Sequence, residues 1–253
     1  MMTDLQKAGM WKRISAFILD FILLCVVASG FALAVSAVAG YDAASDALNA
    51  RYDYFQKEYD VDLKITEEEY TKLPEEEKEK YDIAYKAISD DTETMQAYSR
   101  VVNLTLLITS LGIFLAVLAL EFAVPLFLKN GQTLGKKIFA VCLMTTGGTR
   151  VTPAALFVRS LLGKYALEIM VPVLVFLMII FNGIGFIGLA VLGLIAVLQV
   201  ALILFTANNS LIHDLLAGTV AVDASSQMIF DTAEERDEYI RKEAAERAAR
   251  EKY

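Results

Sequence analysis

Four long apolar runs constrain the fold of this chain more than any other feature of its sequence. They cover approximately residues 14–39, 101–128, 154–181 and 184–206. About 20 apolar residues in a helix cross a hydrocarbon core about 30 Å thick, and each run reaches that length. Only helices and closed barrels satisfy the backbone inside a bilayer, and these runs are too long for barrel strands. The sequence therefore predicts an all-α membrane protein with a four-transmembrane-helix bundle.

Charge is distributed in blocks around these runs. The chain has 253 residues, is 56% hydrophobic and carries a formal net charge of −8. This composition is too apolar for a soluble protein, and most of the acidic residues lie in 42–93 and 231–251. We therefore expect the lipid bilayer as the surrounding medium and no nucleic-acid partner.

The two cysteines are too few and too far apart for a disulfide framework or a thiolate metal site. Cys25 lies inside the first apolar run and Cys142 follows the second. We expect both to be small buried apolar side chains.

Basic residues beside the short loops predict the orientation. Lys12, Arg13, Lys136, Lys137 and Arg159 all fall on one side, whereas the 182–185 turn between the third and fourth runs has no charge. The positive-inside rule then places both termini in the cytoplasm of a multi-pass plasma-membrane protein.

The expected organisation alternates membrane helices with polar segments. In order, these are an N-terminal segment with the first helix (1–40), an extracellular acidic helical insertion (41–100), the second helix (101–128), a cytoplasmic loop containing GQTLGK and a small hairpin (129–153), the third and fourth helices (154–206), a cytoplasmic HDLLAGT segment (207–225) and a charged helical tail (226–253).

Helix signals recur in the 41–100 insertion. Thr66 precedes three glutamates in the position of an N-cap, and Pro74 suits the start of another helix. Two or three amphipathic helices are expected there. Three roles stay open for them: a gate, a partner-binding module, or a solvated extension without a site.

Short-range patterns also predict structure on the cytoplasmic side. The β-prone run 138–145 followed by TTGGTR indicates a hairpin, and TVAVD at 219–223 resembles a strand. The tail at 231–252 has opposite charges at i,i+4 spacing and is expected to be an exposed helix.

Three carboxylates lie inside the apolar runs, where charge is expensive. Asp20, Glu121 and Glu168 all fall roughly 10–13 Å from the cytoplasmic ends of their helices, at 1.5 Å per residue. If the three carboxylates lie close together, repulsion between their charges and desolvation would raise the pKa of at least one of them. A bound cation would then compete with the proton for that carboxylate. The alternative is structural, with Asp20 paired to Arg13, Arg159 or Lys164 to fix helix packing.

Three sequence patches together resemble the RDD family of integral membrane proteins. They are AGMWKRISAFILD at 8–20, GQTLGKK at 131–137 with the following GGTRVTP and Arg159, and SLIHDLLAGTVAV at 210–222. The resemblance implies that Arg13, Asp20 and Asp214 are the family-motif residues. It also implies transport, with sodium/proton exchange proposed for some relatives.

Two functions follow as alternatives. The first is a membrane transporter, exchanging sodium, another monovalent cation or protons through Asp20, Glu121 and Glu168, with Lys136 and Arg159 as basic residues at the cytoplasmic edge. The second is a scaffold or regulator that binds partners through the insertion and the tail. No nucleophile and base pair, metal cluster or phosphate loop is apparent, so neither an enzyme nor a cofactor is expected. Four helices are few to enclose a path, which makes a homo-oligomer an open alternative.

Overall fold

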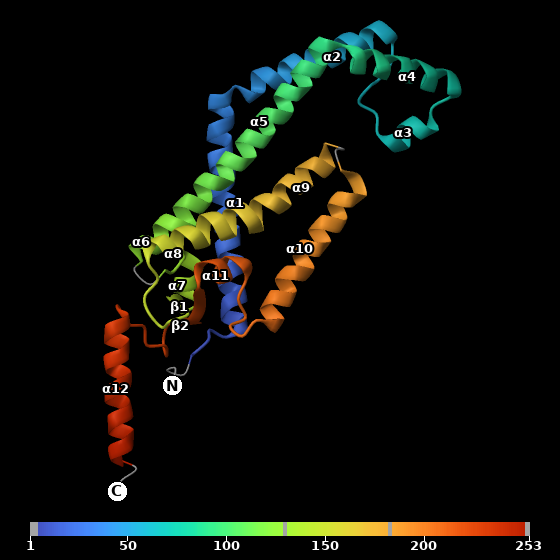
Figure 1. The fold of residues 1–253 in the computed structure, drawn as a ribbon. Helices are drawn as coiled ribbons and strands as arrows, with labels where there is room; N and C mark the ends of the chain where they lie inside the picture. The colour runs from blue at the N-terminus through green and yellow to red at the C-terminus, as the bar shows by residue number, and fades with distance from the viewer. Residues whose placement is uncertain (1–4, 129–130, 182–183, 251–253) are drawn as a thin grey trace. The chain divides into compact units, whose positions relative to one another are not determined.

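The chain is mostly helical and divides into two compact units. The computed structural model describes residues 5–128, 131–181 and 184–250 (Figure 1). One unit contains Met1–Ser29 and Ile113–Tyr253, and the other contains Gly30–Gly112. The buried charged residues of the predicted site all belong to the first unit.

Within the described residues, four helical spans are long and apolar enough to cross a membrane, which confirms the predicted fold class. Two of them contain a π-helical stretch between α-helical parts. The spans are α1 (Met10–Ala39); α5 (Thr92–Val117) with η1 (Leu118–Ala123) and α6 (Val124–Phe127); α8 (Pro153–Phe157) with η2 (Val158–Met170) and α9 (Val171–Ile180); and α10 (Gly185–Phe205). The expected turn residues Asn182 and Gly183 lie outside the described residues.

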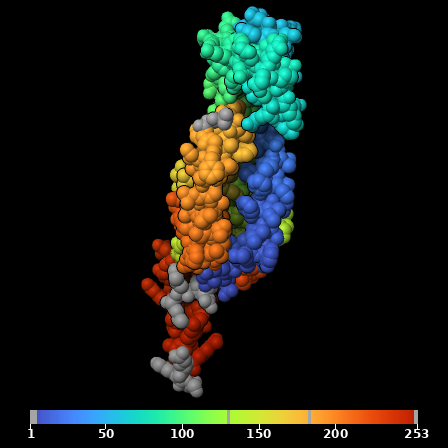
Figure 2. Space-filling model, turned by 90° about the vertical axis from the view of Figure 1, so that its right-hand side faces the viewer, coloured from blue at the N-terminus to red at the C-terminus, as the bar shows by residue number. Residues whose placement is uncertain are grey.

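The outer faces of these helices are apolar. Figure 2 shows α10 in orange along the surface, and its Phe186, Leu194 and Phe205 are among the exposed large apolar side chains. Such a face suits lipid rather than water. Cys25 is also exposed, so the expectation that it is buried was wrong, whereas Cys142 is buried as expected. A small apolar thiol on a helix that faces lipid needs no protein packing around it.

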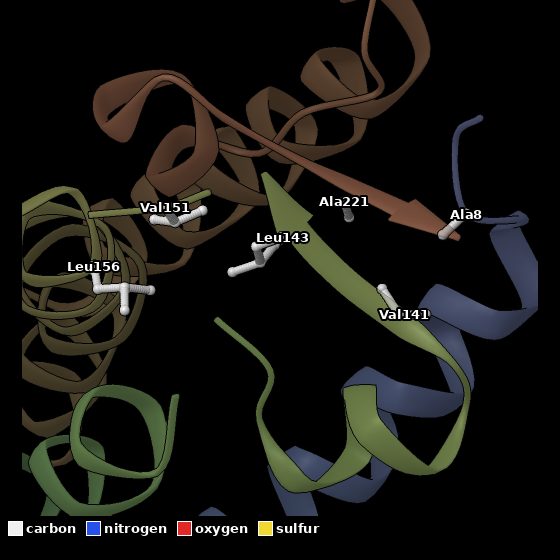
Figure 3. Packing of buried hydrophobic residues seen from close by; sticks show 6 residues of the cluster. All are labelled: Ala8, Val141, Leu143, Val151, Leu156 and Ala221. Atoms are coloured by element: carbon white, nitrogen blue, oxygen red, sulfur yellow. The ribbon is translucent and has the colours of Figure 1, made fainter. Parts of the chain in front are cut away.

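A two-stranded sheet forms the apolar centre of the first unit. Strand β1 (Val141–Thr145) pairs antiparallel with β2 (Thr219–Asp223). Leu143 is fully buried on this sheet, and Figure 3 shows its cluster with Ala8, Val141, Val151, Leu156 and Ala221. This sheet attaches the segments before the first span and after the fourth span to the loop between the second and third.

The expected hairpin at 138–150 is present but short, and the main partner of its strand lies elsewhere in the chain. A turn does follow β1, with Thr145 N–H donating to Thr149 O at 2.8 Å and one bridge between Met144 and Arg150. The partner along the whole strand is β2, which lies far along the chain. The buried, apolar β1 packs better against TVAVD than against the polar residues that follow its own turn.

The described part of the first unit contains three helices besides the spans. They are α7 (Leu134–Ile138), α11 (Ile212–Ala217) and α12 (Ala233–Arg250). Helix α12 is exposed and carries the expected i,i+4 pairs, Glu238 with Lys242 at 2.7 Å and Glu243 with Arg247 at 2.5 Å. The prediction of an exposed charged tail helix is confirmed.

The second unit contains the helices predicted for the insertion. They are α2 (Tyr41–Tyr59), α3 (Glu67–Lys72) and α4 (Glu75–Asp90). Thr66 caps α3 in a reciprocal capping box with Glu69, and Pro74 precedes α4 as expected. Ala84 and Ile88 of α4 are buried, as is Phe55 of α2, so these short amphipathic helices bury a small core of their own.

Candidate functional site

The π-helical stretches carry most of the buried charge in the membrane spans. Glu121 lies on η1, and Arg159, Lys164 and Glu168 lie on η2. Glu168 comes nine positions after Arg159, which is two and a half turns of an α-helix with 3.6 residues per turn, on the opposite face. In a π-helix each backbone N–H bonds to the C=O group five residues earlier, so each turn holds more residues than a turn of an α-helix. Nine positions then make about two turns. The π-helical backbone therefore brings Arg159, Lys164 and Glu168 towards one face.

The carboxylate of Asp20 binds the start of α7. Its Oδ1 accepts the Gly135 backbone N–H at 2.7 Å, and its Oδ2 accepts the Thr133 hydroxyl. Lys136 Nζ lies 3.9 Å from the same Oδ2. Both Asp20 oxygens thus have donors, and the loop between the second and third spans is attached to the first span.

Local sequence explains how α7 reaches Asp20. The Thr133 hydroxyl caps the helix by accepting the Lys136 N–H, and the backbone N–H groups of the first turn remain free for a carboxylate. A Cβ on Gly135 would lie 2.4 Å from the Ala16 backbone O. Only glycine allows α7 to approach α1 this closely.

Glu121 forms a second, separate group of charges. Its Oε1 accepts a hydrogen bond from Lys164 Nζ. Its backbone O accepts a hydrogen bond from the Ser160 hydroxyl at 2.6 Å. The residue is 2% exposed, yet Glu121 Oε2 has no hydrogen-bond partner among the residues that the structure describes. A buried carboxylate oxygen without a donor is costly, and a proton or a cation would satisfy it.

Lys136 lies between these two groups. Burial lowers its pKa to about 8, against the opposing effect of the Glu121 charge, while Arg159 and Lys164 lower it further. Its Nζ donates to Thr133 Oγ1 at 3.2 Å. This lysine is therefore a buried cation that can lose its proton under mildly alkaline conditions.

Arg159 and Asp214 form a buried ion pair. Arg159 Nε donates to Asp214 Oδ1 at 3.0 Å, and Thr219 Oγ1 donates to the same oxygen at 2.8 Å. Burial opposes ionisation of Asp214, but Arg159, His213 and Thr219 outweigh it and hold the pKa of the carboxyl well below its usual range. The pair joins η2 to α11 and, through Thr219, to β2.

Glu168 binds His213, the only histidine of the sequence. Glu168 Oε1 accepts the His213 backbone N–H at 2.9 Å, and Oε2 lies 2.6 Å from His213 Nδ1. A Cβ on Gly163 would lie 2.6 Å from His213 Cα, so glycine at this position allows α11 to lie against η2.

Arg13 reaches the same end of the molecule through a backbone group. Its Nη2 donates to Asn209 O at 2.7 Å, and no ion pair joins Arg13 directly to Asp214 in the part of the chain described. The family-motif arginine thus attaches α1 to the segment before α11, whereas Arg159 neutralises the aspartate.

The three membrane carboxylates accordingly have three different sets of partners. Asp20 binds α7, Glu121 binds Lys164, and Glu168 binds His213. Within residues 5–128, 131–181 and 184–250, no group of three or more His, Cys, Asp and Glu side chains could hold a metal ion. The arrangement is a row of paired charges rather than one carboxylate cluster.

Four contributing residues were not singled out from the sequence. Thr133 and Gly135 bind Asp20, Ser160 binds the Glu121 backbone, and Thr219 binds Asp214. The signal for the first two was the glycine inside TLGKK, which follows a capping threonine at the start of a short helix. Ser160 and Thr219 carry no comparable local signal.

Comparison with known proteins identifies a family. The model of the RDD family matches residues 7–218, which include every charged residue of the candidate site. No curated protein and no solved structure matches the chain.

Proposed function

Because the chain belongs to the RDD family of membrane proteins, we propose that it exchanges a monovalent cation for protons across the plasma membrane, with Glu121 as the carboxylate for which both ions compete. The observation that supports this proposal is the buried Glu121 Oε2, which has no donor in the described part of the chain. An ion that occupies this position replaces a missing hydrogen bond. Exchange follows because proton and cation compete for one oxygen.

The two lysines near Glu121 oppose a bound cation while both are charged, so cation binding in the proposed exchange depends on Lys136 losing its proton. Lys164 contacts one carboxylate oxygen, and Lys136 is close enough for its positive charge to act on Glu121. Loss of a proton from Lys136 would weaken the positive field around Glu121 and favour a bound cation. Asp20 and Glu168 are poorer candidates, because both oxygens of each already accept hydrogen bonds or contact a ring nitrogen.

Ion flux in proteoliposomes tests the proposal. Vesicles with an internal pH dye receive sodium, potassium or lithium gradients, and the wild type is compared with Glu121→Gln. Glu238→Gln, on the exposed α12, is the matched carboxylate control. We expect cation-dependent proton flux in the wild type and control but not in Glu121→Gln. Absence of flux from a folded wild type, or equal flux in Glu121→Gln, would refute the proposal.

We further propose that both termini lie in the cytoplasm. The basic residues Lys7, Lys12 and Lys137 flank the spans on the side of β1 and β2, and short flanks rich in lysine and arginine stay inside. Reaction of single cysteines at Ser226 and Ser89 with a membrane-impermeant thiol reagent in whole cells, in a chain without Cys25 and Cys142, tests this orientation. Ser89 should react and Ser226 should not; the reverse pattern would overturn the proposal.

A role as a scaffold is the second candidate, supported by the folded acidic helices of the second unit. The capping box of α3 and the buried Ala84 and Ile88 of α4 indicate that this insertion is built to hold a defined surface. Crosslinking followed by purification, with and without residues 42–98, tests this role. A partner recovered by the full chain and lost on deletion would support it, and recovery of the same partner without 42–98 would refute it.

A further inference from the structure

His213 lies between two carboxylates that belong to different helices. Its Nδ1 is 2.6 Å from Glu168 Oε2 on η2, and its Nε2 is 3.5 Å from Asp214 Oδ2 on α11. All three residues are largely buried, with the His213 side chain 7% exposed. One imidazole ring therefore connects a carboxylate in a membrane span to a carboxylate outside it.

Hydrogen-bond chemistry determines which nitrogen carries the hydrogen. An ionised carboxylate only accepts hydrogen bonds, so the short contact to Glu168 requires a hydrogen on Nδ1. In the neutral ring, Nε2 then directs a lone pair at the Asp214 oxygen, which explains why this second distance is longer. A proton on Nε2 would convert this repulsive contact into a charge-assisted hydrogen bond.

The two oxygens of the Asp214 side chain contact different groups. Arg159 and Thr219 both donate to Oδ1, whereas Oδ2 lies towards His213. Glu168 is held by the His213 backbone N–H and by the Gln199 side chain from α10. The carboxylates on both sides of the ring are thus held in place without the imidazole proton.

We propose that Glu168, His213 and Asp214 form a proton-binding site, in which Nε2 of His213 takes up the proton and Nδ1 shares its own hydrogen with Glu168. Uptake forms an N–H bond at Nε2, and transfer onwards breaks the N–H bond at Nδ1 and forms an O–H bond on Glu168 Oε2. The ring then returns to a neutral state with its hydrogen on Nε2. A role for this site in ion exchange rests on the proposed function, whereas proton binding itself does not.

Charges around the ring set the conditions for uptake. Burial and the Arg159 charge lower the pKa of His213 from its ordinary value of 6.5, while Asp214 and Glu168 raise it. These groups come from η2 and α11, and Gln199 of α10 is the neutral polar neighbour of Glu168. The ring is therefore neutral near pH 7 and takes up its proton on acidification.

The single histidine makes a direct experiment practicable. The full chain, labelled with ¹⁵N-histidine and placed in lipid nanodiscs, contributes one imidazole spectrum, because the sequence contains one histidine. We expect the tautomer with hydrogen on Nδ1 at neutral pH and a doubly protonated ring at acidic pH. A wild-type ring with hydrogen only on Nε2 at neutral pH would overturn the proposal.

Variants identify the two carboxylates. Glu168→Gln and Asp214→Asn should each weaken proton binding by His213 roughly tenfold or more, because each removes an opposite charge within reach of the ring. Asp20→Asn, in the carboxylate that binds α7, is the buried control and should leave the titration unchanged. Glu168→Gln keeps an acceptor for the backbone N–H, so it remains informative if Asp214→Asn fails to fold. Equal titration midpoints in the wild type and Glu168→Gln would refute the site.

The flux and titration experiments fail independently. If His213 titrates as expected in a protein without cation-dependent flux, the proposed proton site is supported and the proposed transport is refuted. If the protein shows cation-dependent flux but its histidine carries the hydrogen only on Nε2 at neutral pH, transport is supported and this proton site is refuted.

Discussion

The Gly135 backbone lies directly against the Asp20 carboxylate. The Gly135 N–H donates to Asp20 Oδ1 at 2.7 Å, and these two residues are 115 positions apart in the chain. A Cβ at position 135 would come within 2.8 Å of the same oxygen and 2.4 Å of Ala16 O. The costly aspartate in the first span therefore has a structural task, which is to hold the loop that follows the second span.

A methyl group at position 135 should separate this loop from α1. Gly135→Ala places its Cβ against the Ala16 backbone carbonyl, which cannot rotate away, and overpacking of this kind costs about 1–3 kcal/mol. Thermal unfolding in detergent, followed by far-ultraviolet circular dichroism, measures the loss. Gly193→Ala, where no atom lies within 4 Å of the added Cβ, is the control and should be neutral or slightly stabilising. Equal stability of the Gly135→Ala variant and the wild type would contradict the close approach.

Substitutions at Asp20 should separate hydrogen bonding from charge. Asparagine can still accept the Gly135 N–H and can donate to the Thr133 hydroxyl, so Asp20→Asn should remain nearly as stable as the wild type. Asp20→Ala leaves those donors without their acceptor, at about 1–3 kcal/mol for each buried donor. Unfolding of both variants measures this difference, and cation-dependent flux should persist in Asp20→Asn. Loss of flux in an Asp20→Asn variant that is as stable as the wild type would indicate that Asp20, rather than Glu121, binds the ion.

Breaking the buried pair between Arg159 and Asp214 should be more damaging than replacing it. Arg159→Met leaves an unpaired buried carboxylate, at about 3–5 kcal/mol, whereas Arg159→Met combined with Asp214→Leu removes both charges. The double variant should therefore recover part of the stability that the single variant loses. Chemical denaturation of the wild type, Arg159→Met, Asp214→Leu and the double variant gives the coupling energy. Strict additivity of the two single-variant losses would show that the pair is not coupled.

Acidification should destabilise the folded protein through His213. Its folded-state pKa lies below the ordinary value of 6.5, so the unfolded chain binds the proton at higher pH than the folded chain does. The free energy of unfolding should then fall as the pH drops below 6.5, until the folded-state pKa is reached. The lowered pKa of Asp214 acts in the same direction only below its ordinary value of 3.8, so the two contributions fall in different pH ranges. Unfolding of the wild type and His213→Gln over a pH series measures this dependence, and an unchanged slope in His213→Gln would contradict it.

Features that depend on local sequence were predicted well. The four spans follow from apolar length, the α3 cap follows from Thr66, and the α12 helix follows from its charge spacing. The partner of β1 was not predictable in the same way, because its own turn offers a nearer partner than β2. Burial on the sheet, rather than distance along the chain, decides between them.

The sequence by itself determined which charged groups fall inside the apolar spans, because the position of a residue in an apolar run is a property of the sequence alone. The tertiary structure alone decided which partner each group has. Asp20 meets Gly135, and Glu168 meets His213, only after distant segments pack together. The faces on which Arg159 and Glu168 lie also depend on the π-helical backbone of η2, since an α-helix would place them on opposite sides. Hydropathy acts residue by residue along the chain, whereas ion pairing depends on distances in space that the folded backbone creates.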